Sequence, residues 1–149
     1  MEVYFTVNPA FRTYALCAAI LALKMLFSAF YTGVQRSRHQ AFVNAEDAKT
    51  FGRPGASAST DEDPAVAHAL RIQRNDGENI PIFFAVGLIY VLLAARPLGA
   101  AIYCWTYTIA RILHTIAYMR NLQPWRAIFF IIGTLCLIGM IVQIIAKAL

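Results

Sequence analysis

The chain has 149 residues, of which 59% are hydrophobic and 14% are charged, and its formal net charge is +5 at neutral pH. Soluble domains contain roughly 45–50% apolar and about 25% charged residues, so this composition excludes an ordinary soluble globular protein. The mean hydropathy of +0.55 agrees with that exclusion. Cys17, Cys104 and Cys136 all lie in apolar runs, so we expect buried thiols and no disulfide network. The sequence indicates a small integral membrane protein.

Four apolar segments are long enough to cross a bilayer as helices. The expected spans cover about residues 12–36, 64–95, 98–120 and 124–147, all within one domain of residues 1–149. The second begins with a polar half that we expect to protrude into water. Pro97 and Pro124 stand in the two short connections, and proline suits the first turn of a helix. The predicted fold class is therefore all-α, a bundle of four transmembrane helices.

The first two spans are separated by a long loop, about residues 37–63. Its glycines and Pro54 are typical of flexible connections, and the sequence leaves open whether the loop is ordered. Asp61, Glu62 and Asp63 precede Pro64 and give the second helix an acidic start, which favours its dipole.

The distribution of lysine and arginine predicts the orientation, since cytosolic connections carry an excess of these residues. One side of the membrane has eight of them: Arg36, Arg38, Lys49, Arg53, Arg71, Arg74, Arg120 and Arg126. The other side has three: Arg12, Arg96 and Lys147. The long loop is therefore expected in the cytosol, with both termini on the opposite side.

Polar side chains inside the spans form two stripes. Polar groups in a membrane are costly, so they are functional candidates by default. The second helix carries Arg71, Arg74, Asn75 and Glu78 at the spacing i, i+3, i+4, i+7, and the third carries Tyr107, Arg111, His114, Thr115 and Tyr118. Both stripes run toward the cytosolic end, which predicts a pocket wall there.

Several of these residues also suit a structural role. Arg74 and Glu78 match an i,i+4 ion pair, and His114 matches a hydrogen bond between helices. We interpret Lys24, Asp76 and Arg111 as structural intramembrane charges, with Asp76 able to neutralise one of the two cations between helices.

The pattern of ligating residues argues against a metal site, because no His-x-x-x-His pair, paired cysteines or intramembrane carboxylate cluster occurs. No element that reads nucleic acid is present either. Arginines, an amide and a carboxylate suit a small zwitterionic, peptide-like ligand, and apolar walls would admit a lipophilic molecule from the bilayer. The pattern favours a reaction between a water-soluble and a membrane-dissolved partner.

Five sequence blocks resemble one family, the membrane-associated proteins in eicosanoid and glutathione metabolism (MAPEG). The blocks are Lys24-Met25, residues 41–47 (AFVNAED), residues 71–81 with the string RNDGENIP, residues 110–118 (ARILHTIAY) and residues 123–127 (QPWRA). Gly77 and Ala45 depart from the family's pattern, and Gly77 is expected to loosen its helix by up to about 1 kcal/mol.

The resemblance implies a homotrimer that binds glutathione, as a co-substrate and without a metal, between neighbouring subunits near the cytosolic face. Glutathione would contact Arg36, Arg71, Arg74, Asn75, Glu78, His114, Tyr118 and Arg126. Arg126 is expected to stabilise the glutathione thiolate, because a guanidinium and a helix N-terminus both favour S⁻. Asp47 either assists the chemistry or caps local structure.

Within the family, the chain resembles the type-one microsomal glutathione transferases and the inducible prostaglandin E synthases. The synthase branch typically has hydroxyl groups where this sequence has Ala127 and Phe130, which favours a transferase that also reduces peroxides. Its expected partners are lipophilic electrophiles or lipid hydroperoxides and membrane lipid. The alternatives are a glutathione-dependent prostaglandin E synthase and a non-catalytic lipid-binding membrane protein. We expect the endoplasmic reticulum or another intracellular membrane in a eukaryote, or the inner membrane in a bacterium, with the active site toward the cytosol.

Overall fold

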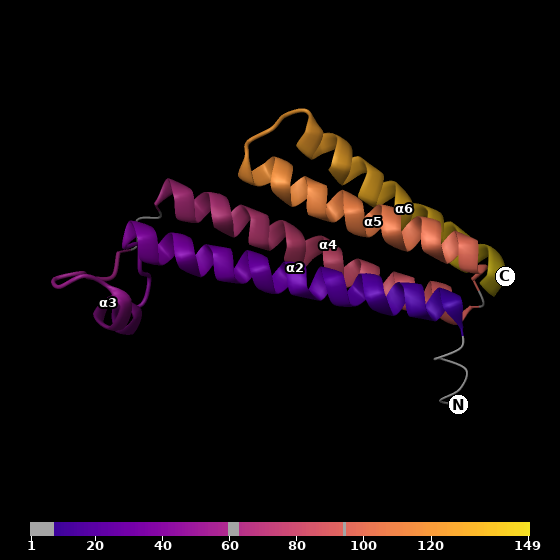
Figure 1. Ribbon diagram of the computed structural model, residues 1–149, viewed down its shortest axis with the longest axis horizontal. Coiled ribbons are helices and arrows are strands. Elements are labelled where there is room, and N and C mark those ends of the chain that lie inside the picture. The colour runs from indigo at the N-terminus through magenta and orange to yellow at the C-terminus, as the bar shows by residue number, and fades with distance from the viewer. Residues whose placement is uncertain (1–7, 60–62, 94) are drawn as a thin grey trace. The chain divides into compact units, whose positions relative to one another are not determined.

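The structure is a computed structural model that describes residues 8–59, 63–93 and 95–149. In this part of the chain it contains five helices and no strand, which confirms the all-α prediction. The helices are α2 (Pro9–His39), α3 (Ala45–Phe51), α4 (Pro64–Leu92), α5 (Pro97–Met119) and α6 (Trp125–Ala148) (Figure 1). Each of the four longer helices lies within a few residues of one predicted span.

Two of the described helices, α2 and α6, are long and apolar enough to cross a membrane. Charged residues explain why α4 falls short, since Arg71, Arg74, Asp76 and Glu78 occupy its first half. Of the four long helices in the described residues, two have the length and hydropathy expected of a membrane span.

The described residues form two compact units, and α2 and α4 run through both. The first unit contains residues 8–24 and Glu78–Leu149. In it, α5 and α6 pack side by side (Figure 1). Tyr14 Oη on α2 donates a hydrogen bond to the Phe84 carbonyl on α4 at 2.8 Å. The Phe83 ring on α4 stacks on the Tyr107 ring of α5, with centroids 4.5 Å apart.

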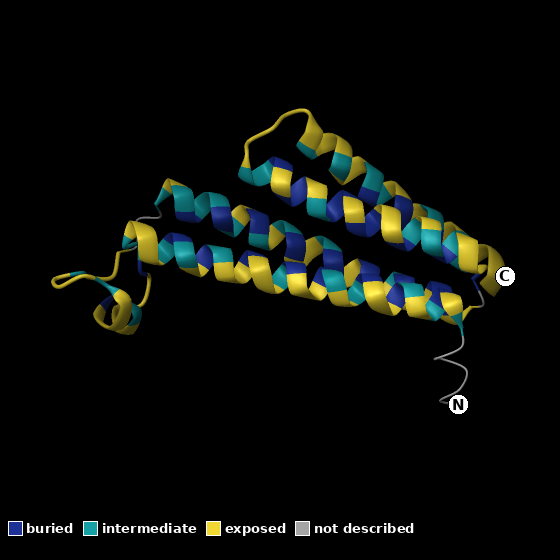
Figure 2. Ribbon diagram, viewed as in Figure 1, coloured by how far each residue is buried: buried dark blue, intermediate teal, exposed yellow. Residues whose placement is uncertain are grey.

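The α6 helix is apolar around most of its circumference. Gly133, Cys136, Leu137 and Met140 form its buried stripe, whereas the positions between them leave large side chains exposed (Figure 2). These exposed side chains include Ile131, Leu135, Ile138 and Val142. A helix that is hydrophobic on its outer face as well as its inner one is typical of a membrane span. All three cysteines are buried and free, which confirms the prediction for them.

Polar side chains join α4, α5 and α6 within the first unit. Tyr90 Oη donates to Gln143 Oε1 at 3.1 Å, and Gln143 Nε2 donates to Tyr103 Oη at 3.0 Å. Lys147 Nζ donates to the Leu93 carbonyl at 2.8 Å. The amide of Gln143 is thus hydrogen-bonded at both ends, which makes this polar residue tolerable inside an apolar helix.

The second unit is the described part of Met25–Gly77. Here Ser28 Oγ on α2 donates a short hydrogen bond to Asp76 Oδ2 on α4. Asp63 accepts from the backbone N–H of Ala65 at 2.8 Å and so caps α4, as its place before Pro64 predicts. The same carboxylate lies 3.3 Å from His39 Nδ1 at the end of α2. Asp61 and Glu62, which complete the predicted acidic start, lie outside the described residues.

The long connection predicted over residues 37–63 contains helical structure. The α2 helix continues to His39, and α3 occupies residues 45–51. Asn44 stands at the N-cap of α3 in extended conformation, Glu46 and Asp47 lie in its first turn, and Lys49 lies in its last. These residues are the sequence signals of a helix. Their stretch is too short to show an apolar period, so the pattern of hydrophobic residues did not reveal it.

Candidate functional site

The polar stripe of α5 faces the interior of the first unit. Tyr107, Arg111, His114 and Thr115 are all buried, and Tyr118 is partly exposed. Since side chains of this polarity are costly to bury, the surroundings of each one decide what it can do.

Arg111 is 1% exposed. Its Nη2 donates to Asn79 Oδ1 at 2.9 Å, and its guanidinium lies 5.1 Å from the Tyr107 ring centroid and 5.2 Å from that of Phe130. A Cβ at Gly133 would lie 3.2 Å from Arg111 Nε, so the glycine leaves room for the guanidinium. Nε and Nη1 have no hydrogen-bond partner among the described residues.

Asp76, the carboxylate predicted to neutralise Lys24 or Arg111, lies in the second unit with its short hydrogen bond from Ser28. Lys24, Asp76 and Arg111 are 9%, 2% and 1% exposed. Burial to this degree fits the structural role expected of all three charges.

Arg126 lies in the first turn of α6 and is partly exposed. Its guanidinium lies over the Tyr118 ring, 4.5 Å from the centroid. With the side-chain amide of Gln123 oriented to satisfy both groups, Oε1 accepts from Arg126 Nε at 3.1 Å and from Nη2 at 2.6 Å. The ring thus lies against a face of the guanidinium, and the amide lies against its Nε edge.

A run of ring contacts connects Arg111 and Arg126. The His114 ring lies 5.8 Å from that of Tyr118 and 6.1 Å from that of Phe130, which in turn lies beneath Arg111. The first unit therefore brings together three of the predicted glutathione ligands, namely His114, Tyr118 and Arg126.

The α4 helix carries the predicted stripe on its exposed side. Arg71, Arg74 and Glu78 are exposed and Asn75 is partly exposed, whereas Asp76 is buried, as the helical phase predicts. The three charged groups are therefore accessible to a soluble ligand.

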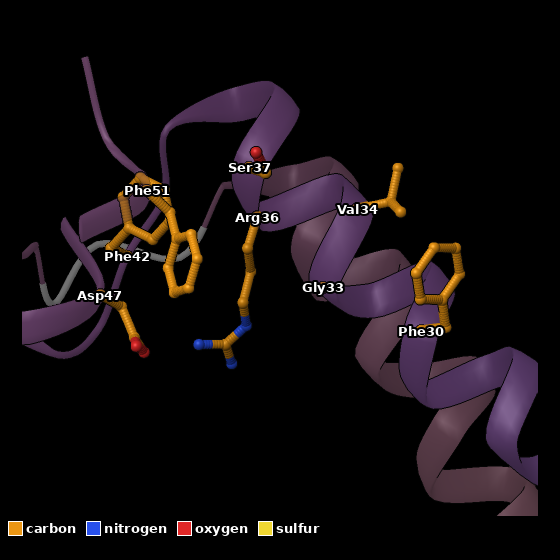
Figure 3. A pocket seen from close by; sticks show the side chains of 8 residues that line it. All are labelled: Phe30, Gly33, Val34, Arg36, Ser37, Phe42, Asp47 and Phe51. Carbon is orange, nitrogen blue, oxygen red and sulfur yellow. The ribbon is translucent and has the colours of Figure 1, made fainter.

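A cavity of about 510 Å³ lies in the second unit between α2 and the segment that contains α3 (Figure 3). Its lining is mostly apolar and consists of Phe30, Gly33, Val34, Arg36, Ser37, Phe42, Asp47 and Phe51. The Arg36 side chain reaches from α2 toward the space into which the Asp47 carboxylate projects from α3 (Figure 3). Two predicted site residues thus line an apolar cavity.

Asp47 is also part of the local structure of α3. Its Oδ2 accepts from Asn44 Nδ2 at 3.2 Å across the first turn. The carboxylate therefore has a structural contact beside the predicted assistance to chemistry.

Two partners in the site were not predicted from the sequence. Asn79, which accepts from Arg111, stands inside the block that carries the family resemblance, and Gln123 stands three residues before Arg126. The i,i+3 spacing at the start of a helix was the available signal for Gln123. Among the described residues no group of three or more His, Cys, Asp or Glu side chains is placed to hold a metal ion.

The sequence matches the profile of the MAPEG family over residues 14–146. The chain belongs to the MAPEG family. Prostaglandin E synthase of Homo sapiens is 35% identical over 142 residues, which covers 95% of this chain and 91% of that protein. Prostaglandin E synthase of Mus musculus is 39% identical over 118 residues, 79% of this chain and 73% of that protein. Microsomal glutathione S-transferase 1 of Homo sapiens is 35% identical over 128 residues, 85% of this chain and 83% of that protein.

Proposed function

We propose that this protein is a membrane-bound glutathione transferase that joins the glutathione thiolate to lipophilic electrophiles and also reduces lipid hydroperoxides. The observation that carries the proposal is the fixed guanidinium of Arg126 at the start of α6. MAPEG membership and a relative named microsomal glutathione S-transferase 1 support it.

A thiolate is the nucleophile in this chemistry, and an ordinary thiol is mostly protonated at neutral pH. The positive charge of Arg126 and the positive end of the α6 dipole both favour S⁻, so together they lower the pKa of the bound thiol. The thiol proton leaves to water. The thiolate then attacks an electrophilic carbon, a C–S bond forms, and a leaving group such as halide departs with the bonding electrons.

Glutathione carries two carboxylates, an ammonium group and amides, and the candidate residues match these groups. The exposed arginines Arg71 and Arg74, together with Arg36, suit the carboxylates, Glu78 suits the ammonium group, and Asn75 suits the amides. His114 and Tyr118 complete the proposed binding set beside Arg126. The phenyl rings of the cavity that contains Arg36 and Asp47 suit a lipophilic electrophile, with Asp47 able to assist its conversion.

The membrane arrangement is part of the proposal. We place four transmembrane helices, α2, α4, α5 and α6, in a single domain of a homotrimer, with the segment that contains α3 on the cytosolic side. Lysine and arginine are concentrated on that side. The proposed location is the endoplasmic reticulum or another intracellular membrane in a eukaryote, and the inner membrane in a bacterium.

The test is a titration of the detergent-purified protein with glutathione, in which thiolate formation is followed by ultraviolet difference absorbance. Arg126→Ala is compared with Arg120→Ala, which removes an equal charge from the same connection. We expect thiolate absorbance in the wild type and in Arg120→Ala, and none in Arg126→Ala. Equal thiolate signals in all three proteins would exclude Arg126 as the stabilising residue. Absence of glutathione binding in the wild type would favour a non-catalytic lipid-binding protein instead.

A glutathione-dependent prostaglandin E synthase is the second candidate, because relatives of that name have identities as high as that of the transferase. Ala127 and Phe130 are the residues that weigh against it, since neither provides a hydroxyl group. The two candidates are separated by assaying conversion of a prostaglandin endoperoxide alongside conjugation of an aryl halide. Conversion of the endoperoxide alone would reassign the protein to the synthases.

A further inference from the structure

The connection between α5 and α6 contains a contact that the proposed reaction does not yet explain. Gln123 is an exposed residue, yet its side-chain amide lies against the guanidinium of Arg126. With the amide oriented so that Oε1 faces Arg126, this oxygen accepts from Nε at 3.1 Å and from Nη2 at 2.6 Å. Exposed side chains of this length ordinarily sample several rotamers. A specific contact to a candidate catalytic group is therefore informative.

The geometry leaves a defined part of the guanidinium available. Five N–H groups project from the planar head of arginine in a fixed fork. Gln123 accepts from Nε–H and from one N–H of Nη2, and the Tyr118 ring covers a face of the plane. The two N–H groups of Nη1 and the second N–H of Nη2 remain, and they point along the far edge of the guanidinium.

The chemistry of the acceptor matters as much as its position. An amide oxygen is neutral, so it orients the guanidinium without cancelling its charge. A carboxylate at the same place would orient it as well, but it would form an ion pair and reduce the positive potential at the far edge. A thiolate needs that potential in order to form at neutral pH.

We propose that Gln123 is a positioning residue for Arg126, which holds the guanidinium with its Nη1 edge toward the glutathione sulfur while leaving its charge intact. The inference rests on the proposed function and deepens it. It implies that thiolate formation depends on a side chain that itself does not contact glutathione.

The experiment measures the pKa of the bound glutathione thiol from the pH dependence of the thiolate absorbance, at saturating glutathione. Gln123→Ala removes the acceptor, and Gln123→Glu keeps an acceptor of equal length but adds a negative charge. Leu122→Ala, an exposed neighbour in the same connection, is the matched control. Thermal denaturation of each variant reports whether it is folded.

We expect Gln123→Ala to raise the thiol pKa, with a roughly three- to tenfold loss of thiolate at neutral pH, where a tenfold loss corresponds to about one pKa unit. The pKa should rise further in Gln123→Glu and stay at the wild-type value in Leu122→Ala. The KM for glutathione should change little, because binding is assigned to other residues. A purely structural role of Gln123 would change the denaturation temperature and not the thiol pKa.

Three results would overturn the proposal in distinguishable ways. An unchanged thiol pKa in folded Gln123→Ala would remove the positioning role and leave the proposed function standing. A lowered pKa in Gln123→Glu would show that the neutrality of the acceptor is irrelevant. Absence of thiolate in the wild type would overturn the proposed function itself and this inference with it.

Discussion

Replacing Asn79 by leucine tests how the buried charge of Arg111 is stabilised. Asn79 Oδ1 is the hydrogen-bond acceptor of Arg111 Nη2, while Nε and Nη1 have none among the described residues. Asn79→Leu is close in volume, so it removes the acceptor without opening a large cavity. Within the described part of the chain, the guanidinium would then keep its contacts with the Tyr107 and Phe130 rings and no hydrogen bond.

The magnitude follows from burial and charge. Hydrogen bonds between helices in membranes average about 0.6 kcal/mol and reach about 1.7 kcal/mol. Bonds to charged groups contribute roughly 1.5–3 kcal/mol. Arg111 is 1% exposed, so water cannot replace the lost acceptor, and the upper end of the membrane range applies. We expect destabilisation of about 1.5–1.7 kcal/mol, where the two ranges overlap, which corresponds to a Tm lower by roughly 3–7 °C for a chain of this size.

The assay is thermal denaturation of the detergent-solubilised protein, followed by circular dichroism. Asn79→Asp keeps the oxygen and places a negative charge beside the guanidinium, so its Tm should equal or exceed that of the wild type. Thr134→Val, which removes a hydroxyl that donates within its own helix, should have little effect. A wild-type Tm in Asn79→Leu would refute the assignment of Asn79 as the partner of Arg111. An equal decrease in Tm in the leucine and aspartate variants would show that the amide nitrogen of Asn79, and not its oxygen, stabilises the protein.

The remaining predictions concern packing, capping and the cavity. Gly139→Ala should lower the free energy of unfolding by about 1–3 kcal/mol through overpacking, because the new Cβ would lie 2.7 Å from Tyr103 Cε1. Gly33→Ala should stabilise its helix by about 0.5–1 kcal/mol, because no atom lies within 4 Å of the new Cβ. Asp63→Ala should lower the free energy of unfolding by about 1 kcal/mol through loss of the α4 cap. Asp63→Asn should keep most of the capping energy, because its side-chain oxygen can still accept from the Ala65 N–H. These losses are measured by thermal denaturation, and similar Tm values for the two variants of either pair would contradict them. In steady-state kinetics, Phe51→Ala should raise the KM for a bulky lipophilic electrophile severalfold and leave the KM for glutathione unchanged. An equal rise in both KM values would contradict the assignment of the cavity to the electrophile.

The positions of the long helices were predictable because their signals are local. Asp63 and Pro64 are good cap and first-turn residues, and α4 begins at that proline. The apolar run of α6 is long enough for a span by itself. Gly77 and Pro81 did not interrupt α4, since the helix continues through both residues to Leu92. Packing along the rest of a 29-residue helix outweighs the weak preference of single residues.

The partners of the buried charges were less predictable. Helical phase groups residues on one face of a helix, and the structure buries Arg111 and His114 on α5 and Asp76 on α4. It could not give the axial register of α4 against α5, which decides which α4 side chain Arg111 meets. Asn79, which accepts from Arg111, follows Asp76 by about one turn, and this neutral partner was not predicted from the sequence.

Arg111 and Arg126, both in the first unit, have neighbours of the same kinds. Arg111 has the Asn79 amide and two aromatic rings, and Arg126 has the Gln123 amide and the Tyr118 ring. A carboxylate would bind either guanidinium more strongly, but it would also neutralise it. Amides and ring faces fix the orientation of a cation while preserving its field, at some cost in stability. At the partly exposed Arg126 the preserved field is available to a bound anion, whereas the 1% exposed Arg111 has a structural use for the same kind of contacts.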